Sequence, residues 1–330
     1  MNNYAEAIIC FQKALRCDTS DLRCWEGLAE AYAHEGQFVA ALKAFGRATD
    51  LDPTSVHANY EKALVKQKIG LLDEAVEGFM RTLELAEEQN KPNYLPAIKG
   101  LADTYIEQAK EEIQQGFFGR AADSCGKVIK TSLVGLHQDA SIIGFWKLIG
   151  DACTIYRIVP TNLHLCAYSE LQQAMNLLLE NESPHQRLGF PESDTSAALL
   201  NDFVGLDVTV DDFYLPPKTA LGVVLTCAGF AYKQALLLSK GHRLIAPALW
   251  HDIGLLYHWM AEGNRSDDEQ EDVHVEIAMR CVRTALKQEP TQYLYWNTLG
   301  VVAIRDSPEI SHYAFTKAME LNSRVNVLRI

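Results

Sequence analysis

The residue types that could perform catalysis are present, but not at the spacings that catalysis requires. His274 and Glu276 form an HxE pair like that of zinc deaminases, yet no PCxxC follows to complete the metal ligands. The phosphate-wrapping loops GxxxxGK and GxGxxG are absent from the sequence, as are the metalloprotease HExxH and the hydrolase GxSxG. The sequence therefore predicts no enzyme, no catalytic residue and no cofactor.

Two further sets of potential metal ligands share a spacing of seven residues: His251 and His258, with His242 nearby, and Cys10, Cys17 and Cys24. Zinc sites combine such ligands with further cysteines or carboxylates, which the histidine set lacks. In the cysteine set, a turn at residues 18–21 separates Cys24 from the other two. With no CxxC pair anywhere, the eight cysteines are expected to be reduced core thiols rather than metal ligands.

Composition and charge indicate an ordinary globular protein whose partners are proteins. Of the 330 residues, 48% are hydrophobic and 22% are charged, which excludes a mostly disordered chain. A net charge of -13 repels polyphosphates, so direct nucleic-acid binding is not expected. The N-terminus lacks a signal peptide, and the weakly charged run 219–232 is too short for a membrane span and is expected to be a buried helix. The predicted location is the cytoplasm, and nothing in the sequence opposes a nuclear pool.

The sequence repeats itself at an offset of 34 residues. Ala7, Phe11 and Ala14 align with Ala41, Phe45 and Ala48. Trp25, Leu28, Ala29 and Tyr32 precede the second set at a spacing that keeps them on one helical stripe, and Pro53 closes the unit. The aromatic start recurs at Trp146 with Gly150, at Trp250 with Gly254 and Tyr257, and at Trp296 with Leu299 and Gly300.

This pattern resembles the tetratricopeptide repeat (TPR) family, whose unit is a hairpin of two helices. The resemblance implies an all-α fold, a right-handed α-solenoid of stacked hairpins interrupted by irregular insertions. Small residues allow the two helices of a hairpin to approach closely, while the aromatic residues fill the space between hairpins. No hairpin buries this face alone, so each one is stabilised by its neighbours.

The repeat phase divides the chain into an expected sequence of segments. Residues 1–132 form a TPR array that starts within a repeat, with an elongated hairpin near 98–130, and residues 133–180 form further TPR-like helices. Residues 181–216, rich in Pro, Asp and Ser, are expected to be an irregular insertion. Residues 217–330 form a second array that begins with one long or two short helices. Within it, the acidic stretch 263–272 is either a solvated loop or a docking site for a basic partner.

The expected inner surface of the first array is acidic. Glu26 and Glu30 lie one and five positions after Trp25, where chaperone-binding members of the family place the Lys and Asn that clamp a peptide carboxylate. Two carboxylates would repel that ligand, so the resemblance to a carboxylate clamp fails here. Glu26, Glu30, His57, Tyr60 and Glu61 form the candidate partner-binding groove, suited to a basic or mixed peptide. A solvated surface without a partner remains the alternative.

Two stretches match more than the repeat consensus: IIGFWKLIGDACTIYR at residues 142–157 and AMRCVRTALKQEPTQYLYWNTLGVVA at 278–303. They closely resemble the large TPR scaffold subunits of the superkiller complex, and the resemblance extends over essentially the whole chain. It implies a non-catalytic scaffold that binds an RNA helicase and a WD-repeat subunit. It also implies indirect association with the exosome and the ribosome in cytoplasmic 3'-5' mRNA decay, with ATP hydrolysis left to the helicase.

Members of that group are several times longer than this chain. The chain opens on a second helix and ends where another hairpin should start, so we expect an interior fragment of the array. The alternative function is a generic TPR adaptor or co-chaperone unrelated to RNA decay.

Overall fold

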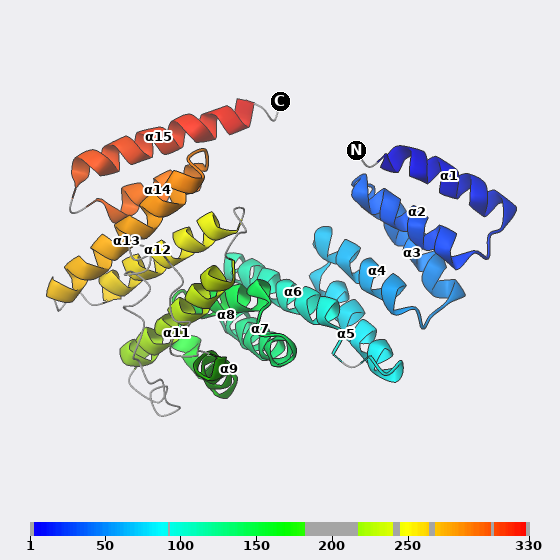
Figure 1. Ribbon diagram of the computed structural model, residues 1–330, viewed down its shortest axis with the longest axis horizontal. Coiled ribbons are helices and arrows are strands. Elements are labelled where there is room, and N and C mark those ends of the chain that lie inside the picture. The colour runs from blue at the N-terminus through cyan, green and yellow to red at the C-terminus, as the bar shows by residue number, and fades with distance from the viewer. Residues whose placement is uncertain are drawn as a thin grey trace. The chain divides into compact units, whose positions relative to one another are not determined.

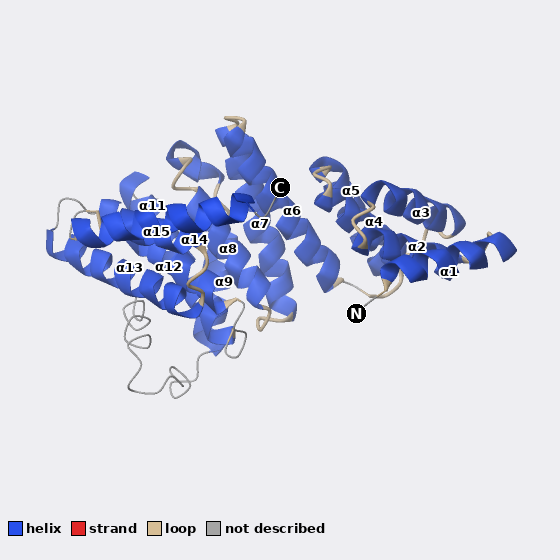
Figure 2. Ribbon diagram, turned by 90° about the horizontal axis from the view of Figure 1, so that it is seen from above, coloured by secondary structure: helices blue, strands red, loops and turns tan. Residues whose placement is uncertain are grey.

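The computed structural model describes residues 3–91, 93–181, 217–239, 245–263, 268–304 and 307–327, and these form helices joined by turns. The chain divides into two compact units, residues 1–138 and 139–330 (Figures 1 and 2). The first unit contains α1 (Tyr4–Cys17), α2 (Leu22–His34), α3 (Phe38–Leu51), α4 (Val56–Lys68), α5 (Leu72–Glu88), α6 (Leu95–Gln114) and α7 (Phe118–Gln138). The second contains α8 (Ile143–Ile155), the 3-10 helix η1 (Pro160–Leu165), α9 (Tyr168–Asn181), α11 (Pro217–Leu238), α12 (Ala246–Gly263), α13 (Asp268–Gln288), α14 (Tyr293–Val302) and α15 (Pro308–Val327).

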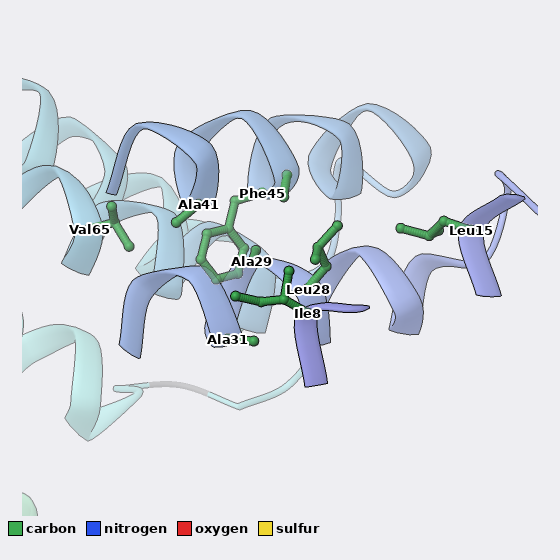
Figure 3. Close-up of a cluster of buried hydrophobic side chains, with 9 residues drawn as sticks. Ile8, Leu15, Leu28, Ala29, Ala31, Ala41, Phe45 and Val65 are labelled. Atoms are coloured by element: carbon green, nitrogen blue, oxygen red, sulfur yellow. The ribbon is translucent and has the colours of Figure 1, made fainter. Parts of the chain in front are cut away.

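In the first unit each helix packs against the next along the chain, as a stack of hairpins requires. The core of the first hairpins is a cluster that includes Ile8, Leu28, Ala29, Ala41 and Phe45, all buried (Figure 3). The Phe45 ring is fully buried beside alanines, whose single methyl groups let α2 and α3 approach closely. The prediction of an all-α array of stacked helix pairs is confirmed.

Three glycines end the first helix of each hairpin in this unit. Gly36, Gly70 and Gly116 have φ values of 76°, 82° and 81°, a left-handed conformation that glycine adopts without steric cost. At the first, the Gln37 amide donates to the Tyr32 carbonyl at 2.8 Å, which closes a Schellman motif. Gly36 and Gly70 are one 34-residue repeat apart, so the turn is part of the repeat itself.

Two kinds of hydrogen bond recur in the turns between hairpins. The indole nitrogens of Trp25, Trp146 and Trp296 each donate to a backbone carbonyl six residues earlier, at 2.8 to 2.9 Å. Asp18 and Asp139, in two of these turns, and Asp52, in the turn between α3 and α4, each accept hydrogen bonds from the amide and hydroxyl of a Ser or Thr two residues on. These bonds hold the pKa of each aspartate below its usual value.

The elongated hairpin is α6 with α7, of 20 and 21 residues, against 13 and 14 for α2 and α3. The boundary expected after residue 132 falls inside α7, which continues to Gln138 because apolar residues such as Leu133 and Leu136 keep one face buried. The two compact units therefore divide after Gln138.

The second unit contains a hairpin whose two helices are far apart in the sequence. Its second helix, α11, packs against α8 and also against α12. A Cβ added at Gly150 of α8 would come within 2.5 Å of the Tyr232 ring of α11, so the close approach requires glycine there. Residues 217–238 form one long helix rather than two short ones. Between α8 and α11 the chain forms η1 and α9, and nearly all of the expected insertion 181–216 lies outside the described residues.

The structure corrects the expectation that every cysteine is a core thiol. Cys125, Cys153, Cys166, Cys227 and Cys281 are buried, but Cys10 and Cys17 are exposed. Helix α1 packs on α2 through the face that carries Ile8 and Leu15. Positions 10 and 17 lie about 200° around the helix from that face.

The acidic stretch 263–272 is also not one continuous loop. Gly263 is the last residue of α12, and α13 begins at Asp268, so the described residues of the stretch are helical. Acidic residues are favourable in the first turn of a helix, which accounts for the extension. Residues 264–267 lie outside the described residues.

Helix α11 contains a segment, Ala220–Leu238, that is long and apolar enough to cross a membrane by length and composition alone. In the structure 61% of the apolar window is buried. Because α11 packs against both α8 and α12, it is the core helix of its unit, as expected for residues 219–232.

Candidate protein-binding surface

Most residues of the repeat pattern lie in the cores of the two units. Four of them are fully buried: Ala29, Ala41, Phe45 and Ala48. Five more are almost fully buried: Leu28, Trp146, Trp250, Tyr257 and Leu299. Trp25, Tyr32, Ala7, Phe11 and Trp296 are half-buried, and Pro53 lies in the turn after α3. A Cβ at Gly254 or Gly300 would overlap Val282 or Phe315 of the paired helix. Ala14 is exposed, and its neighbour Leu15 makes the core contact instead.

Charged side chains link α2 and α4 at the surface of the first unit. The His57 Nε2 atom lies 2.7 Å from Glu30 Oε1, and both side chains are nearly half exposed. One turn earlier on α2, Glu26 Oε1 accepts a hydrogen bond from the Ser55 hydroxyl at 3.0 Å. Both carboxylates thus project from α2 toward the start of α4.

Glu61 completes this acidic cluster from the next turn of α4. Its pKa is raised, mainly by burial and further by the nearby Glu30 charge, against the opposing influence of His57, Lys68 and His34. The structure therefore brings four of the five predicted groove residues together: Glu26, Glu30, His57 and Glu61. We call these four residues the α2/α4 acidic surface.

Tyr60 belongs to a different environment from the other predicted groove residues. Its ring lies 6.0 Å from Phe79 and 5.8 Å edge-on from Tyr94, next to the apolar cluster of α5 and α6. Burial raises the pKa of Tyr60 to about 12. Tyr60 therefore anchors α4 to its neighbours, and its phenol ring contributes mainly to packing.

No family model matches the chain. Superkiller protein 3 of Schizosaccharomyces pombe is 30% identical over 307 residues, 91% of this chain and 20% of the relative. Superkiller protein 3 of Saccharomyces cerevisiae is 36% identical over 324 residues, 97% and 21% of the two chains. Tetratricopeptide repeat protein 37 of Xenopus laevis is 26% identical over 326 residues, which are 97% of this chain and 18% of the relative.

This chain is a tetratricopeptide repeat protein homologous to Superkiller protein 3. The similarity covers more than nine-tenths of the chain, whereas the chain spans about a fifth of the length of the curated relatives it matches. The resemblance inferred from residues 142–157 and 278–303 is thereby confirmed.

In this TPR chain, the second unit has a charged cluster at positions equivalent to Glu26 and Glu30. Lys147 and Asp151 lie one and five residues after Trp146, and the Lys147 Nζ atom is 2.9 Å from both carboxylate oxygens of Asp151. Lys147 also bonds Asp252 of α12 at 3.1 Å, and the Tyr232 hydroxyl of α11 donates to Asp151 at 2.8 Å. Burial raises the pKa of Asp151, and the Lys147 charge opposes that rise.

The histidines considered as metal ligands take part in packing between TPR helices. His251 Nε2 lies 2.9 Å from the Thr298 hydroxyl, and its Nδ1 atom lies 3.3 Å from Asp252. His258 Nε2 is 4.0 Å from Glu262 one turn along α12. His242 lies outside the described residues, and within those residues no three His, Cys, Asp or Glu side chains gather into a group that could hold a metal ion.

Sequence reasoning missed two charged residues of the TPR first helices, Lys99 and Asp103 of α6. They are an ion pair at 2.6 Å, and the Asp103 charge acts on Tyr60. A signal was available, because Lys99 and Asp103 lie one and five residues after Ile98, the position equivalent to Trp25. The aliphatic residue at that position hid the equivalence.

Proposed function

We propose that this chain is a non-catalytic protein-protein interaction scaffold of the superkiller complex, supporting helicase-driven, exosome-mediated 3'-5' decay of cytoplasmic mRNA. The observation that carries the proposal is the similarity to superkiller proteins over more than nine-tenths of the chain. Stacked helix hairpins present extended surfaces to other proteins, which suits a scaffold.

The proposed direct partners are the RNA helicase subunit and the WD-repeat subunit, with the exosome and ribosome reached through them. The net charge of -13 repels RNA phosphates, which supports the proposal that the partners, rather than this chain, bind the RNA. The proposed location is the cytoplasm, with a nuclear pool open to test.

Within this proposal the α2/α4 acidic surface binds a basic or mixed peptide segment of a partner. Three carboxylates and one imidazole, partly exposed and drawn from two adjacent helices, offer acceptors for lysine or arginine side chains. Glu26 and Glu30 are already aligned by Ser55 and His57, so a basic side chain would meet preorganised acceptors.

A generic TPR adaptor is the second candidate. It is favoured by similarity to the Peroxisomal targeting signal receptor of Saccharomyces cerevisiae, 26% identical over 132 residues and 40% of this chain. The smaller coverage makes it the weaker candidate.

Affinity capture tests both candidates. The tagged chain is incubated with cytoplasmic extract with and without ribonuclease, and bound proteins are identified by mass spectrometry. We expect recovery of an RNA helicase and a WD-repeat protein in both conditions. Recovery of chaperones or unrelated cargo alone would move the chain to the adaptor class, and recovery of the helicase only without ribonuclease would contradict direct binding.

A charge-reversal pair tests the surface. Glu26→Lys with Glu30→Lys should abolish capture of one partner. The control is Glu77→Lys with Glu88→Lys, which makes the same charge change at exposed positions of α5 and should leave capture unchanged. Equal loss in both variants would assign the effect to overall charge rather than to the α2/α4 acidic surface.

A further inference from the structure

A pocket lies in the first unit and shares no residue with the α2/α4 acidic surface. It has a volume of about 390 Å³ and lies between the α4–α5 turn and the end of the elongated hairpin. Its lining residues are Gly70, Leu71, Leu72, Asp73, Glu74, Gln108, Glu111, Glu112, Gln115 and Arg120. Three of them, Gln108, Glu111 and Glu112, belong to the last two turns of α6.

The pocket is negatively charged. Four carboxylates line it, and two cations neutralise part of that charge: Lys66 bonds Glu74 at 2.9 Å, and Arg120 lies 3.4 Å from Glu112. Two negative charges therefore remain in excess. Glu111 makes no ion pair within the described part of the chain and is exposed at the rim.

Exposed apolar side chains lie beside the pocket. Phe117 and Phe118, in the turn that starts α7, are each 47% exposed, and Leu71 is 41% exposed. Such neighbouring exposed apolar side chains are typical of interaction sites. The negative charge of the pocket and the exposed aromatic rings beside it are complementary to a cationic side chain flanked by apolar residues.

Arg120 shows that the local geometry accepts a guanidinium. Its charged group lies over the Phe117 ring, 5.5 Å from the ring centre, while it pairs with Glu112. The same two kinds of contact, a carboxylate on one side and a phenyl ring on the other, are available to an arginine from another chain.

We propose that this pocket binds an arginine side chain of a partner protein, inserted among Asp73, Glu111 and Glu112, while apolar residues beside that arginine pack on Leu71, Phe117 and Phe118. The pocket is wide enough for one such side chain with some water. Arg120 then acts as an internal competitor, because its charge repels the incoming guanidinium and its own group occupies the Phe117 ring.

A peptide library tests the proposal with the full chain. Immobilised nonapeptides carry a fixed central arginine, or its neutral isostere citrulline, between randomised flanks, and the labelled chain is applied. We expect selection of arginine peptides with Leu, Phe or Trp at flanking positions, and at least tenfold weaker binding of the matched citrulline peptides. Equal binding of both sets, or no selection of either, would overturn the proposal.

Variants assign the binding to this pocket. Asp73→Asn with Glu111→Gln should weaken the best arginine peptide at least tenfold, and Arg120→Gln should strengthen it several-fold. The control Glu107→Gln removes one carboxylate from the same helix outside the pocket and should change binding less than twofold. Weakening by Arg120→Gln, with folding verified by circular dichroism, would contradict the competitor role, and equal weakening by the control would contradict the site.

Discussion

Two ion pairs with the same spacing show how differently the two units use the same repeat positions. Lys99 and Asp103 of α6, and Lys147 and Asp151 of α8, lie one and five residues after the position equivalent to Trp25. The first pair is an open surface contact, with side chains 45% and 35% exposed. In the second pair the side chains of Lys147 and Asp151 are 34% and 23% exposed. Tyr232 of α11 bonds Asp151, and Asp252 of α12 bonds Lys147.

Equivalent repeat positions therefore have no fixed role. What decides the role is whether a later helix covers the position. At α6 of the first unit the pair stays partly exposed, whereas at α8 of the second unit it links three helices.

The largest effect is expected at the buried tryptophan of the second unit. Trp146 is 1% exposed, so Trp146→Ala should lower the free energy of unfolding by about 3 to 5 kcal/mol. Trp296 makes the same turn hydrogen bond but is half-buried, so Trp296→Ala should cost roughly half as much. Urea unfolding followed by circular dichroism measures both, and equal losses would contradict the difference in burial.

A smaller effect is expected from the matched lysines. Lys147→Met leaves Asp151 and Asp252 without their shared cation and should cost about 2 kcal/mol, less than for fully buried pairs because the side chains keep some solvent contact. Lys99→Met removes an open pair and should cost less than about 0.5 kcal/mol. Thermal unfolding of the two variants side by side checks this. A larger loss of stability for Lys99→Met than for Lys147→Met would contradict the expected difference between the two pairs.

The smallest effect concerns the pH dependence of the first unit. Because the folded-state pKa of Glu61 is raised above its usual 4.5, its contribution to stability is fully present below pH 4.5 and is lost as the pH rises through the raised value. At pH 7, Glu61→Gln should therefore be more stable than the parent by a few tenths of a kcal/mol. Chemical unfolding at pH 4 and pH 7 should show the advantage only at pH 7, and a pH-independent difference would contradict it.

The sequence predicted the repeat and most of the core because both follow from local spacing. The 34-residue offset placed Ala41 and Phe45 in the right helix, and late apolar residues predicted the elongated hairpin α6–α7. The same reasoning failed for Cys10 and Cys17, since apolar residues on both sides of a helix leave open which side is covered. Only the packing of α1 on α2 decides that.

The candidate site was predicted in part for a related reason. Glu26 and Glu30 were found because they lie one and five positions after Trp25, and His57 and Glu61 were added from the next first helix. The orientation of Tyr60 depends on Tyr94, in a turn that the repeat pattern does not specify. The pocket beside Arg120 joins residues up to 50 positions apart, from Gly70 to Arg120, so no local pattern could have revealed it.

One paired measurement separates the proposed partner-binding role of Glu30 in the first unit from the packing role of Asp151 in the second. Glu30→Lys and Asp151→Lys are equivalent substitutions in the two units, compared with the parent chain by thermal unfolding and by affinity capture from extract. The account predicts that Glu30→Lys keeps the parent melting temperature and loses a partner, whereas Asp151→Lys melts several degrees lower. Unchanged capture by Glu30→Lys, or an unchanged melting temperature for Asp151→Lys, would contradict it.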